Sequence, residues 1–189
     1  MRILIGGAGE VGRGLAEALL KEGRVVVLID NNPEVIREAQ SLNALVIQGD
    51  IKHRKTLEEA GISDSNFFIA VTDSDEQNLI SCALARHCIK KHKGDDVGFM
   101  AIARVNDPEM LNEAETGNLT EWTGIRHVVS TIDNSIKRLQ TGLQCIAFEE
   151  VLEIGNDAYI VELKLTKYAT NLAYSNLRDA GKNIAGLPT

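Results

Sequence analysis

The chain has 189 residues, of which 44% are apolar and 4% aromatic, and its formal net charge is −7. This length is enough for one α/β domain with a small additional unit, and the apolar fraction is enough to fill a core. The acidic balance, with one short basic run at residues 90–93, argues against a nucleic-acid partner.

The three cysteines and four histidines form no ligand set in the sequence. The cysteines lack CxxC spacing and are typical of small core residues in a reducing compartment, and the histidines are scattered. No apolar run approaches the length of a membrane span, and the N-terminus lacks a signal-peptide pattern. We therefore expect a soluble cytoplasmic protein with no resident metal and no direct insertion into a membrane.

The first 30 residues predict a dinucleotide-binding βαβ unit. An apolar strand over residues 2–5 leads into Gly7-Ala8-Gly9-Glu10-Val11-Gly12, a helix follows over residues 11–21, and a second strand over residues 25–29 ends on Asp30. In such a unit the first glycine allows the tight turn, the second leaves room for a pyrophosphate, and the third lets the helix pack closely on the sheet. The N–H groups of the first helical turn then face the phosphates.

Asp30 indicates which nucleotide this unit prefers. It lies 18 residues beyond Gly12, where its carboxylate can accept both hydroxyls of an adenosine ribose. A 2′-phosphate would meet its negative charge, and no arginine follows in residues 31–33. The sequence therefore predicts NAD(H) or an adenine nucleotide rather than NADP(H). A Rossmann-type sheet that has lost its ligand remains the alternative.

The following elements continue the alternation of strands and helices. Asn32 is a suitable N-cap for a helix that begins at Pro33, and Gly61 is suited to end a helix around residues 56–60 in a left-handed conformation. A helix from Glu76 is expected to bury Leu79, Ile80, Ala83 and Leu84, and another helix opens at Pro108. The further strands are predicted at residues 44–47, 67–71, 99–103 and 127–130.

Six strands alternating with helices predict a doubly wound parallel sheet, a Rossmann domain, over residues 1–133. Beyond residue 133 the pattern changes. Residues 135–148 are apolar at helical spacing, and residues 159–165 alternate as a half-exposed strand. We expect a linking helix and connector over residues 134–156. Residues 157–189 then begin a small C-terminal α+β domain, cut short or completed by another chain.

Polar residues at successive strand ends predict one crevice, because ligands of open α/β sheets lie across the carboxyl ends of the strands. Asp50 and the backbone beside Thr72 are placed to frame an adenine ring, and Arg104 to pair with phosphate, with Arg13 as a second cation. The predicted nucleotide-contacting residues are Gly7, Ala8, Gly9, Glu10, Val11, Gly12, Asp30, Asn31, Gly49, Asp50, Thr72, Asp73, Asn78 and Arg104.

Structural roles for some of these residues are open alternatives. Asp50 and residues 73–75 are equally suited to cap the helices that follow them, and Arg104 to form a structural ion pair. Glu76, Asp73 and Asp75 have ligand chemistry for a divalent ion, although three acids in a first helical turn more often complement the helix dipole.

Catalytic signatures are missing from the sequence. No tyrosine is followed four residues later by lysine, and there is no Gly-x-Ser-x-Gly and no P-loop. The chain beyond residue 133 is too short for the substrate domain of a two-domain dehydrogenase. We predict a binding protein with no catalytic residues, with an NAD-dependent oxidoreductase or isomerase as the alternative. A methyltransferase would normally end its first strand on an acid, where Ile5-Gly6 stands here.

The ordered motifs resemble the KTN/RCK domains that regulate potassium transport. The resemblance rests on residues 7–12, 29–30 with 33–34, 49–50, 57–62, 69–73 with 75–76 and 78–79, and 103–105. It implies a bound NAD(H) or ATP/ADP, a homo-oligomer of dimers or higher rings, and docking on a membrane-embedded potassium transporter or channel subunit at the inner face of the membrane. Glu10 stands where ATP-preferring relatives often carry a basic residue, so the resemblance favours NAD(H).

Overall fold

The computed structural model describes residues 1–94, 98–123, 125, 127–132, 135–136, 148–154 and 158–163. It divides into two compact units, Met1–Thr131 and Ile132–Thr189. The first unit holds all of the residues predicted to contact a nucleotide.

The first unit is built on a six-stranded parallel sheet in the order β3-β2-β1-β4-β5-β6, which confirms the predicted doubly wound α/β class. The chain starts in the middle of the sheet and winds outward to one edge, then returns to wind outward to the other. The switch between the two directions falls at β1 and β4, where doubly wound folds bind their ligands. The strands are β1 Arg2–Gly6, β2 Val25–Asp30, β3 Leu45–Gln48, β4 Phe67–Ala70, β5 Met100–Arg104 and β6 His127–Val129.

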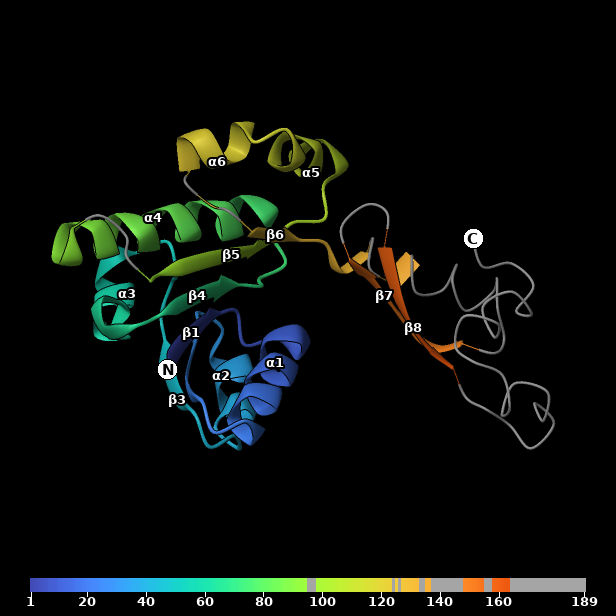
Figure 1. Ribbon diagram of the computed structural model, residues 1–189. Coiled ribbons are helices and arrows are strands. Elements are labelled where there is room, and N and C mark those ends of the chain that lie inside the picture. Colours follow the sequence, from blue (N-terminus) through green and yellow to red (C-terminus); the bar gives the residue numbers. More distant parts are fainter. Residues whose placement is uncertain are drawn as a thin grey trace, which may run out of the picture. The chain divides into compact units, whose positions relative to one another are not determined.

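Helices cover both faces of this sheet (Figure 1). One apolar cluster joins Ile3 and Ile5 of β1 to Ala16 of the first helix, and the other joins Leu4 to Cys82 and Ile89 of the fourth helix. Successive side chains of a strand point to opposite faces, so β1 contributes to both clusters. The helices are α1 Glu10–Lys21, α2 Pro33–Ala39, α3 Arg54–Glu59, α4 Asp75–Lys93, α5 Pro108–Glu115 and α6 Asn118–Thr123, with a 3₁₀ turn at Ile62–Asp64.

Two of the predicted helix boundaries are confirmed in atomic detail. The Asn32 side chain accepts a hydrogen bond from the Glu34 N–H at 2.9 Å, and Pro33 is the first residue of α2. Gly61 follows α3 with φ +78°, which is the left-handed conformation that ends a helix without a Cβ clash.

The predicted burial of Ile80 is wrong, because 54% of this residue is exposed. Asn78 and Ser81 take inward positions on the same helix, and both are fully buried. The apolar pattern predicts the wrong inward face of this helix because the polar side chain of Asn78 is buried with a full set of hydrogen-bond partners.

In the second unit, β7 Phe148–Ile154 and β8 Ala158–Leu163 form an antiparallel pair. The expected strand over residues 159–165 overlaps β8, whereas β7 lies inside the segment expected to be a helix and connector. The adjacent glutamates Glu149 and Glu150 interrupt the alternation that would have indicated a strand. Residues 137–147 of the expected helix and residues 164–189 lie outside the described residues.

Candidate nucleotide-binding site

A cavity of about 260 Å³ lies at the carboxyl ends of the strands around the switch point. It is lined by residues at or beyond the carboxyl ends of β1, β2, β3 and β4, so the fold brings together segments that are far apart in the sequence. Its walls are Gly7, Gly9, Ile29, Asp30, Asn31, Asn32, Val35, Gly49, Ile51, Val71, Thr72, Asp73 and Gln77. Seven of the predicted contact residues are among them, namely Gly7, Gly9, Asp30, Asn31, Gly49, Thr72 and Asp73.

The three glycines of the first turn have different structural roles. Gly7 has φ +102° and donates its N–H to the Ile29 carbonyl oxygen at 2.8 Å, so it needs the left-handed conformation. A Cβ on Gly12 would lie 1.9 Å from the carbonyl oxygen of Gly7, so the helix must approach the turn without a side chain there. A Cβ on Gly9 would meet no atom within 4 Å. Gly9 therefore leaves open space in front of the turn.

The start of α1 offers backbone N–H groups beside that space. Gly9 is the N-cap residue and makes no side-chain capping hydrogen bond. The N–H groups of Glu10, Val11 and Gly12 have no acceptor within the helix because they belong to its first turn. Ala8 is fully buried, whereas Glu10 and Val11 are exposed, so this segment presents its backbone rather than its side chains to an anion.

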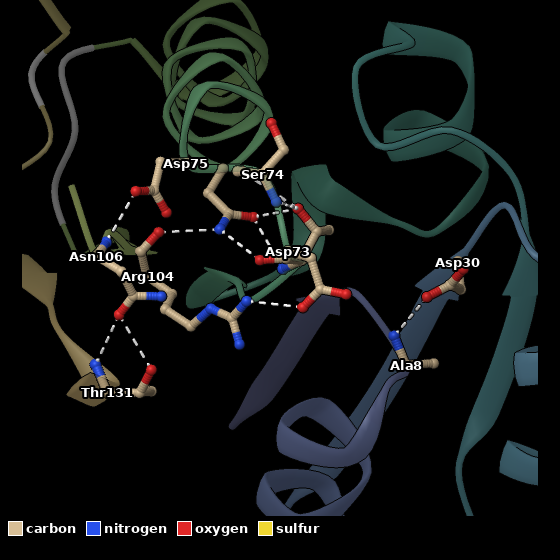
Figure 2. A network of polar contacts seen from close by, with 10 residues as sticks. Ala8, Asp30, Asp73, Ser74, Asp75, Arg104, Asn106 and Thr131 are labelled. Atoms are coloured by element: carbon tan, nitrogen blue, oxygen red, sulfur yellow. Dashed lines mark hydrogen bonds and ion pairs between the residues drawn. The ribbon is translucent and has the colours of Figure 1, made fainter. Parts of the chain in front are cut away.

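Asp30 holds the glycine turn in place. Its Oδ2 accepts the Ala8 N–H at 2.8 Å, as Figure 2 shows, and its Oδ1 accepts the Asn32 N–H at 2.9 Å. The sequence predicted a ribose contact for this carboxylate but not the contact with Ala8. Each carboxylate oxygen has a second lone pair, so Asp30 can hold the turn and still accept a hydroxyl from the cavity.

Gly49 and Asp50 shape the turn after β3. The Gly49 N–H donates to the Asp30 carbonyl oxygen at 2.8 Å, and Gly49 lines the cavity. The Asp50 carboxylate accepts the Lys52 N–H at 2.9 Å, with the Lys52 ammonium 3.6 Å away. Asp50 does not cap α3, because the N-cap position is occupied by His53.

Asn78 links the ends of β4 and β5 from a fully buried position. Its Oδ1 accepts the Thr72 N–H at 2.9 Å and the Thr72 hydroxyl at 2.7 Å, and its Nδ2 donates to the carbonyl oxygens of Thr72 and Arg104, both at 2.9 Å. We call these contacts the Asn78 network. Asn78 thus positions Thr72, which lines the cavity, while its own amide is occupied by the protein.

Arg104 pairs with Asp73 across the same strand ends. The Arg104 Nη2 lies 2.9 Å from the Asp73 Oδ1, and the two side chains differ sharply in exposure, at 12% for Arg104 and 105% for Asp73. The Arg104 Nε is buried and has no hydrogen-bond partner. Arg104 therefore forms the structural ion pair that the sequence left open as an alternative. Its Nε–H donates no hydrogen bond.

The loop after Arg104 is fixed by two further acceptors. The Asp75 carboxylate accepts the N–H groups of Asn106 and Asp107 at 2.9 and 2.8 Å, and the Asn106 Oδ1 accepts the N–H and the hydroxyl of Thr131 at 3.2 and 3.1 Å. Figure 2 shows that these contacts adjoin the Asp73–Arg104 pair. Asp75 therefore joins the start of α4 to the segment after β5.

With this geometry in place, comparison with known proteins identifies the family. The model of the TrkA-N domain matches residues 3–140. The chain belongs to the TrkA-N domain family. The chain is 32% identical to the Trk system potassium uptake protein TrkA of Vibrio alginolyticus, over 79% of this chain and 33% of that protein. It is 38% identical to the TrkA homolog of Pyrococcus abyssi, over 88% of this chain and 70% of that protein.

Solved structures share the fold of this TrkA-N domain. The GsuK RCK domain is 25% identical and has a TM-score of 0.57, over 76% of this chain and 28% of that one. The TrkA-N domain of the Escherichia coli inner membrane protein ybaL is 21% identical, with a TM-score of 0.60 over 75% of this chain and 95% of that one. The chain spans about a third of the length of the Vibrio alginolyticus relative.

Arg13, the second cation considered for phosphate, is engaged by its own neighbours. Its Nη1 donates to the Ala8 carbonyl oxygen at 3.0 Å and lies 2.9 Å from the Glu38 carboxylate. Arg13 therefore braces the TrkA-N domain's glycine turn against α2.

The start of α4 is capped by Ser74, with Glu76 beside it. The Ser74 hydroxyl oxygen accepts the Gln77 N–H at 3.1 Å and the hydroxyl lies 2.8 Å from the Glu76 carboxylate. A hydrogen bond from its own backbone N–H, followed by the one from Ser74, holds the pKa of Glu76 below its ordinary value of 4.5. In the part of the TrkA-N domain that the structure describes, no group of three or more His, Cys, Asp or Glu side chains is placed to hold a metal ion.

Burial raises the pKa of the Cys82 thiol to about 12, and the thiol donates to the Ile102 carbonyl oxygen at 3.3 Å, as expected of a core cysteine. Within the described ranges, no helix is both long enough and apolar enough to cross a membrane.

Proposed function

We propose that this TrkA-N domain binds NAD(H) or an adenine nucleotide in the cavity at the switch point and serves as the cytoplasmic nucleotide-sensing part of a potassium uptake system or channel. The relatives at 32% and 38% identity are named potassium uptake proteins. The proposed partner is a membrane-embedded transporter or channel subunit, with the domain held at the inner face of the membrane as a homo-oligomer.

The single observation that carries the proposal is the open space at Gly9 beside the first-turn N–H groups of α1. Gly7 and Gly12 are required by close backbone packing, so they would be needed in an empty fold as well. Gly9 has no such neighbour, and a glycine there is explained by an anion that approaches the backbone. Asp30 lies on the wall of the same cavity and has lone pairs left for a ribose.

The choice among nucleotides follows from charge. Solved structures with the same fold are described as bound to NAD, to ADP and to AMP, so each of these is a candidate ligand here. Glu10 is exposed in the first turn of α1, where its carboxylate repels additional phosphate charge. This repulsion favours NAD(H), with its two phosphates, over ATP, and Asp30 repels the 2′-phosphate of NADP(H).

Sensing requires more than binding. A ligand shifts an equilibrium between two conformations only when it binds them with different affinity. The cavity wall contains loops after four strands, so phosphate at Gly9 and ribose at Asp30 would be shared between segments from different parts of the chain. The bound nucleotide is then the signal, and the transport partner detects the conformation it favours.

Calorimetric titration of the purified chain with NADH, NAD⁺, ADP, ATP, AMP and NADPH tests the binding. We expect NADH to bind at least about tenfold more tightly than NADPH. Because Asp30 also holds Ala8, an Asp30→Ala variant alone would mix ribose contact with loop distortion. The sharper comparison uses ADP and 2′-deoxy-ADP on both proteins, where the ribose assignment predicts that the wild-type preference for ADP disappears in Asp30→Ala.

An Asp64→Ala variant is the matched control, because Asp64 is an exposed acid that precedes β4 and so lies at the amino ends of the strands. It should bind every nucleotide as the wild type does. Equal discrimination between ADP and 2′-deoxy-ADP by wild type and Asp30→Ala would rule out the ribose contact. Absence of binding by all six nucleotides would rule out the proposed function.

The transport role is tested in the organism that carries the gene. Deleting the gene should slow rubidium uptake from low-potassium medium, and expression of the wild type should restore it. Expression of Asp30→Ala should not restore uptake, whereas Asp64→Ala should. Uptake that is unchanged by the deletion would contradict a role in potassium transport.

A further inference from the structure

The Asp73–Arg104 pair has an unusual distribution of exposure. The Asp73 side chain extends fully into solvent, while the Arg104 side chain is 12% exposed. The pair is joined through one nitrogen, Nη2, and one oxygen, Oδ1, at 2.9 Å. Because the Nε is buried without a partner, the guanidinium has donor capacity that Asp73 does not use.

Such a contact is easily exchanged. An exposed carboxylate regains its hydration when it leaves the guanidinium, so its net attraction is small and is screened by salt. The buried side of Arg104 does not gain hydration in the same way and keeps a need for a negative partner. Asp73 lines the cavity, so a ligand in the cavity lies next to the carboxylate that is paired with Arg104.

We propose that Asp73 is a displaceable substitute for the ligand's phosphate on Arg104, and that the competition between them makes the site select nucleotides by phosphate charge. This inference rests on the proposed nucleotide binding. A phosphate offers more negative charge and more acceptor oxygens than a carboxylate, and it matches the guanidinium bidentately. Its arrival releases Asp73 into solvent, where the carboxylate already lies.

The competition predicts a specific pattern of affinities. Adenosine has no phosphate and leaves the pair intact, whereas ADP must displace Asp73. Replacing Asp73 with asparagine keeps an acceptor oxygen of the same shape but removes the charge. Asp73→Asn should therefore bind ADP about three- to tenfold more tightly than wild type and bind adenosine within about twofold of it.

Calorimetry with adenosine and ADP on four proteins tests the proposal: wild type, Asp73→Asn, Arg104→Met and the double variant. Asp64→Asn removes the same charge at the opposite end of the strands and is the control for net charge. We expect the ADP gain from Asp73→Asn to fall below about twofold in the Arg104→Met background, because the competition needs the guanidinium. A gain that persists there would show simple repulsion by Asp73 and would overturn the proposal.

The outcomes separate this inference from the proposed function. If wild type binds ADP and Asp73→Asn gains nothing, the inference fails while nucleotide binding stands. If neither protein binds ADP, the inference fails, while the proposed function fails only if the other five nucleotides also do not bind. Binding of ADP that becomes measurable only in Asp73→Asn supports both.

A second readout uses wild type alone, in case a variant does not fold. The NMR signal of the Arg104 Nε–H should shift on adding ADP and stay unchanged on adding adenosine. No shift with bound ADP would overturn the proposal.

Discussion

The cavity has two sides that are built in different ways. The glycine side consists of Gly7–Gly12 and Asp30, and its shape comes from backbone approaches that leave no room for a Cβ at Gly12. The network side consists of residues 72–78, of which Thr72, Asp73 and Gln77 line the cavity, together with residues 104–107, which do not line it. Hydrogen bonds centred on Asn78, Asp75 and Arg104 join the two segments.

The difference shows how rigidity and adaptability can be combined in one site. On the glycine side the backbone of Gly12 packs against the Gly7 carbonyl too closely for any side chain, so this turn is suited to a fixed anion position. On the network side the exposed Asp73 can exchange its partner while the buried Asn78 keeps Thr72 in place. We infer that the glycine side binds and the network side discriminates.

The largest expected effect concerns the glycine side. In Gly12→Ala the new Cβ would lie 1.9 Å from the Gly7 carbonyl oxygen, and backbone must shift to accept it. We expect a loss of at least about 3 kcal/mol in the free energy of unfolding, measured by urea denaturation, together with loss of nucleotide binding.

Gly14→Ala is the matched control for this prediction. Gly14 lies in the same helix, and a Cβ there meets no atom within 4 Å. Alanine has the higher helix propensity, so this variant should gain about 0.5–1 kcal/mol. If Gly12→Ala were as stable as Gly14→Ala, the glycine side would not be determined by backbone packing.

The next effect concerns the Asn78 network. Asn78→Ala removes two acceptor contacts to Thr72 and two donor contacts to carbonyl oxygens from a fully buried position. Since buried groups are left without partners, we expect a loss of about 2–3 kcal/mol in the free energy of unfolding and weaker nucleotide binding through Thr72. Ser81→Ala, which removes one buried hydrogen bond to the Asn78 carbonyl oxygen, should cost only about 1 kcal/mol. Equal losses would show that the network has no special role.

A smaller effect separates capping from ligand contact on the network side. The Asp107 carboxylate caps α5 by accepting the N–H groups of Glu109 and Met110 at 2.9 Å. Asp107→Ala should cost about 1 kcal/mol and increase hydrogen exchange in the first turn of α5. Nucleotide affinity should not change, because Asp107 is held at the site through its backbone N–H on Asp75. A large change in affinity would extend the binding site to this loop.

The smallest effect is the pH dependence contributed by Glu76. Its pKa is held below the ordinary value of 4.5 by its backbone N–H and Ser74, so its ionised form is favoured in the folded protein. The contribution to stability is therefore complete above about pH 4.5 and is lost as the pH falls through the lower folded value. Glu76→Gln should lower the denaturation midpoint near pH 7 and leave it unchanged well below pH 4. A difference that is larger in acid would contradict the assignment.

The glycine side could be predicted from sequence because each requirement is local. A glycine that must adopt φ +102°, a helix that follows it at once, and an acid at the tip of the next strand are all visible within 30 residues. The parallel sheet could be predicted equally well, because strands that are covered on both faces are continuously apolar.

The network side could not be predicted in full, because its partners lie far apart in the chain. The sequence predicts a nucleotide contact for Asn78, and the structure adds its hydrogen bonds to Thr72 and to Arg104, which is 26 residues away. Arg104 was open between phosphate and a structural ion pair, and only the placement of β4 beside β5 brings Asp73 to it. The predicted burial of Ile80 is wrong for a related reason. The apolar pattern does not reveal that Asn78 is buried, and so it places the wrong face of α4 against the sheet.

Occupation of the cavity by a nucleotide can be measured by an NMR titration of the backbone amides with NADH and ADP. Binding between the glycine side and the network side should give the largest shifts at Gly9–Gly12, Asn31, Gly49 and Thr72–Asp73. Residues 61–65, at the amino ends of the strands, should stay unchanged. Saturable shifts that spare Gly9–Gly12 and Thr72, or no shifts at millimolar nucleotide, would contradict it.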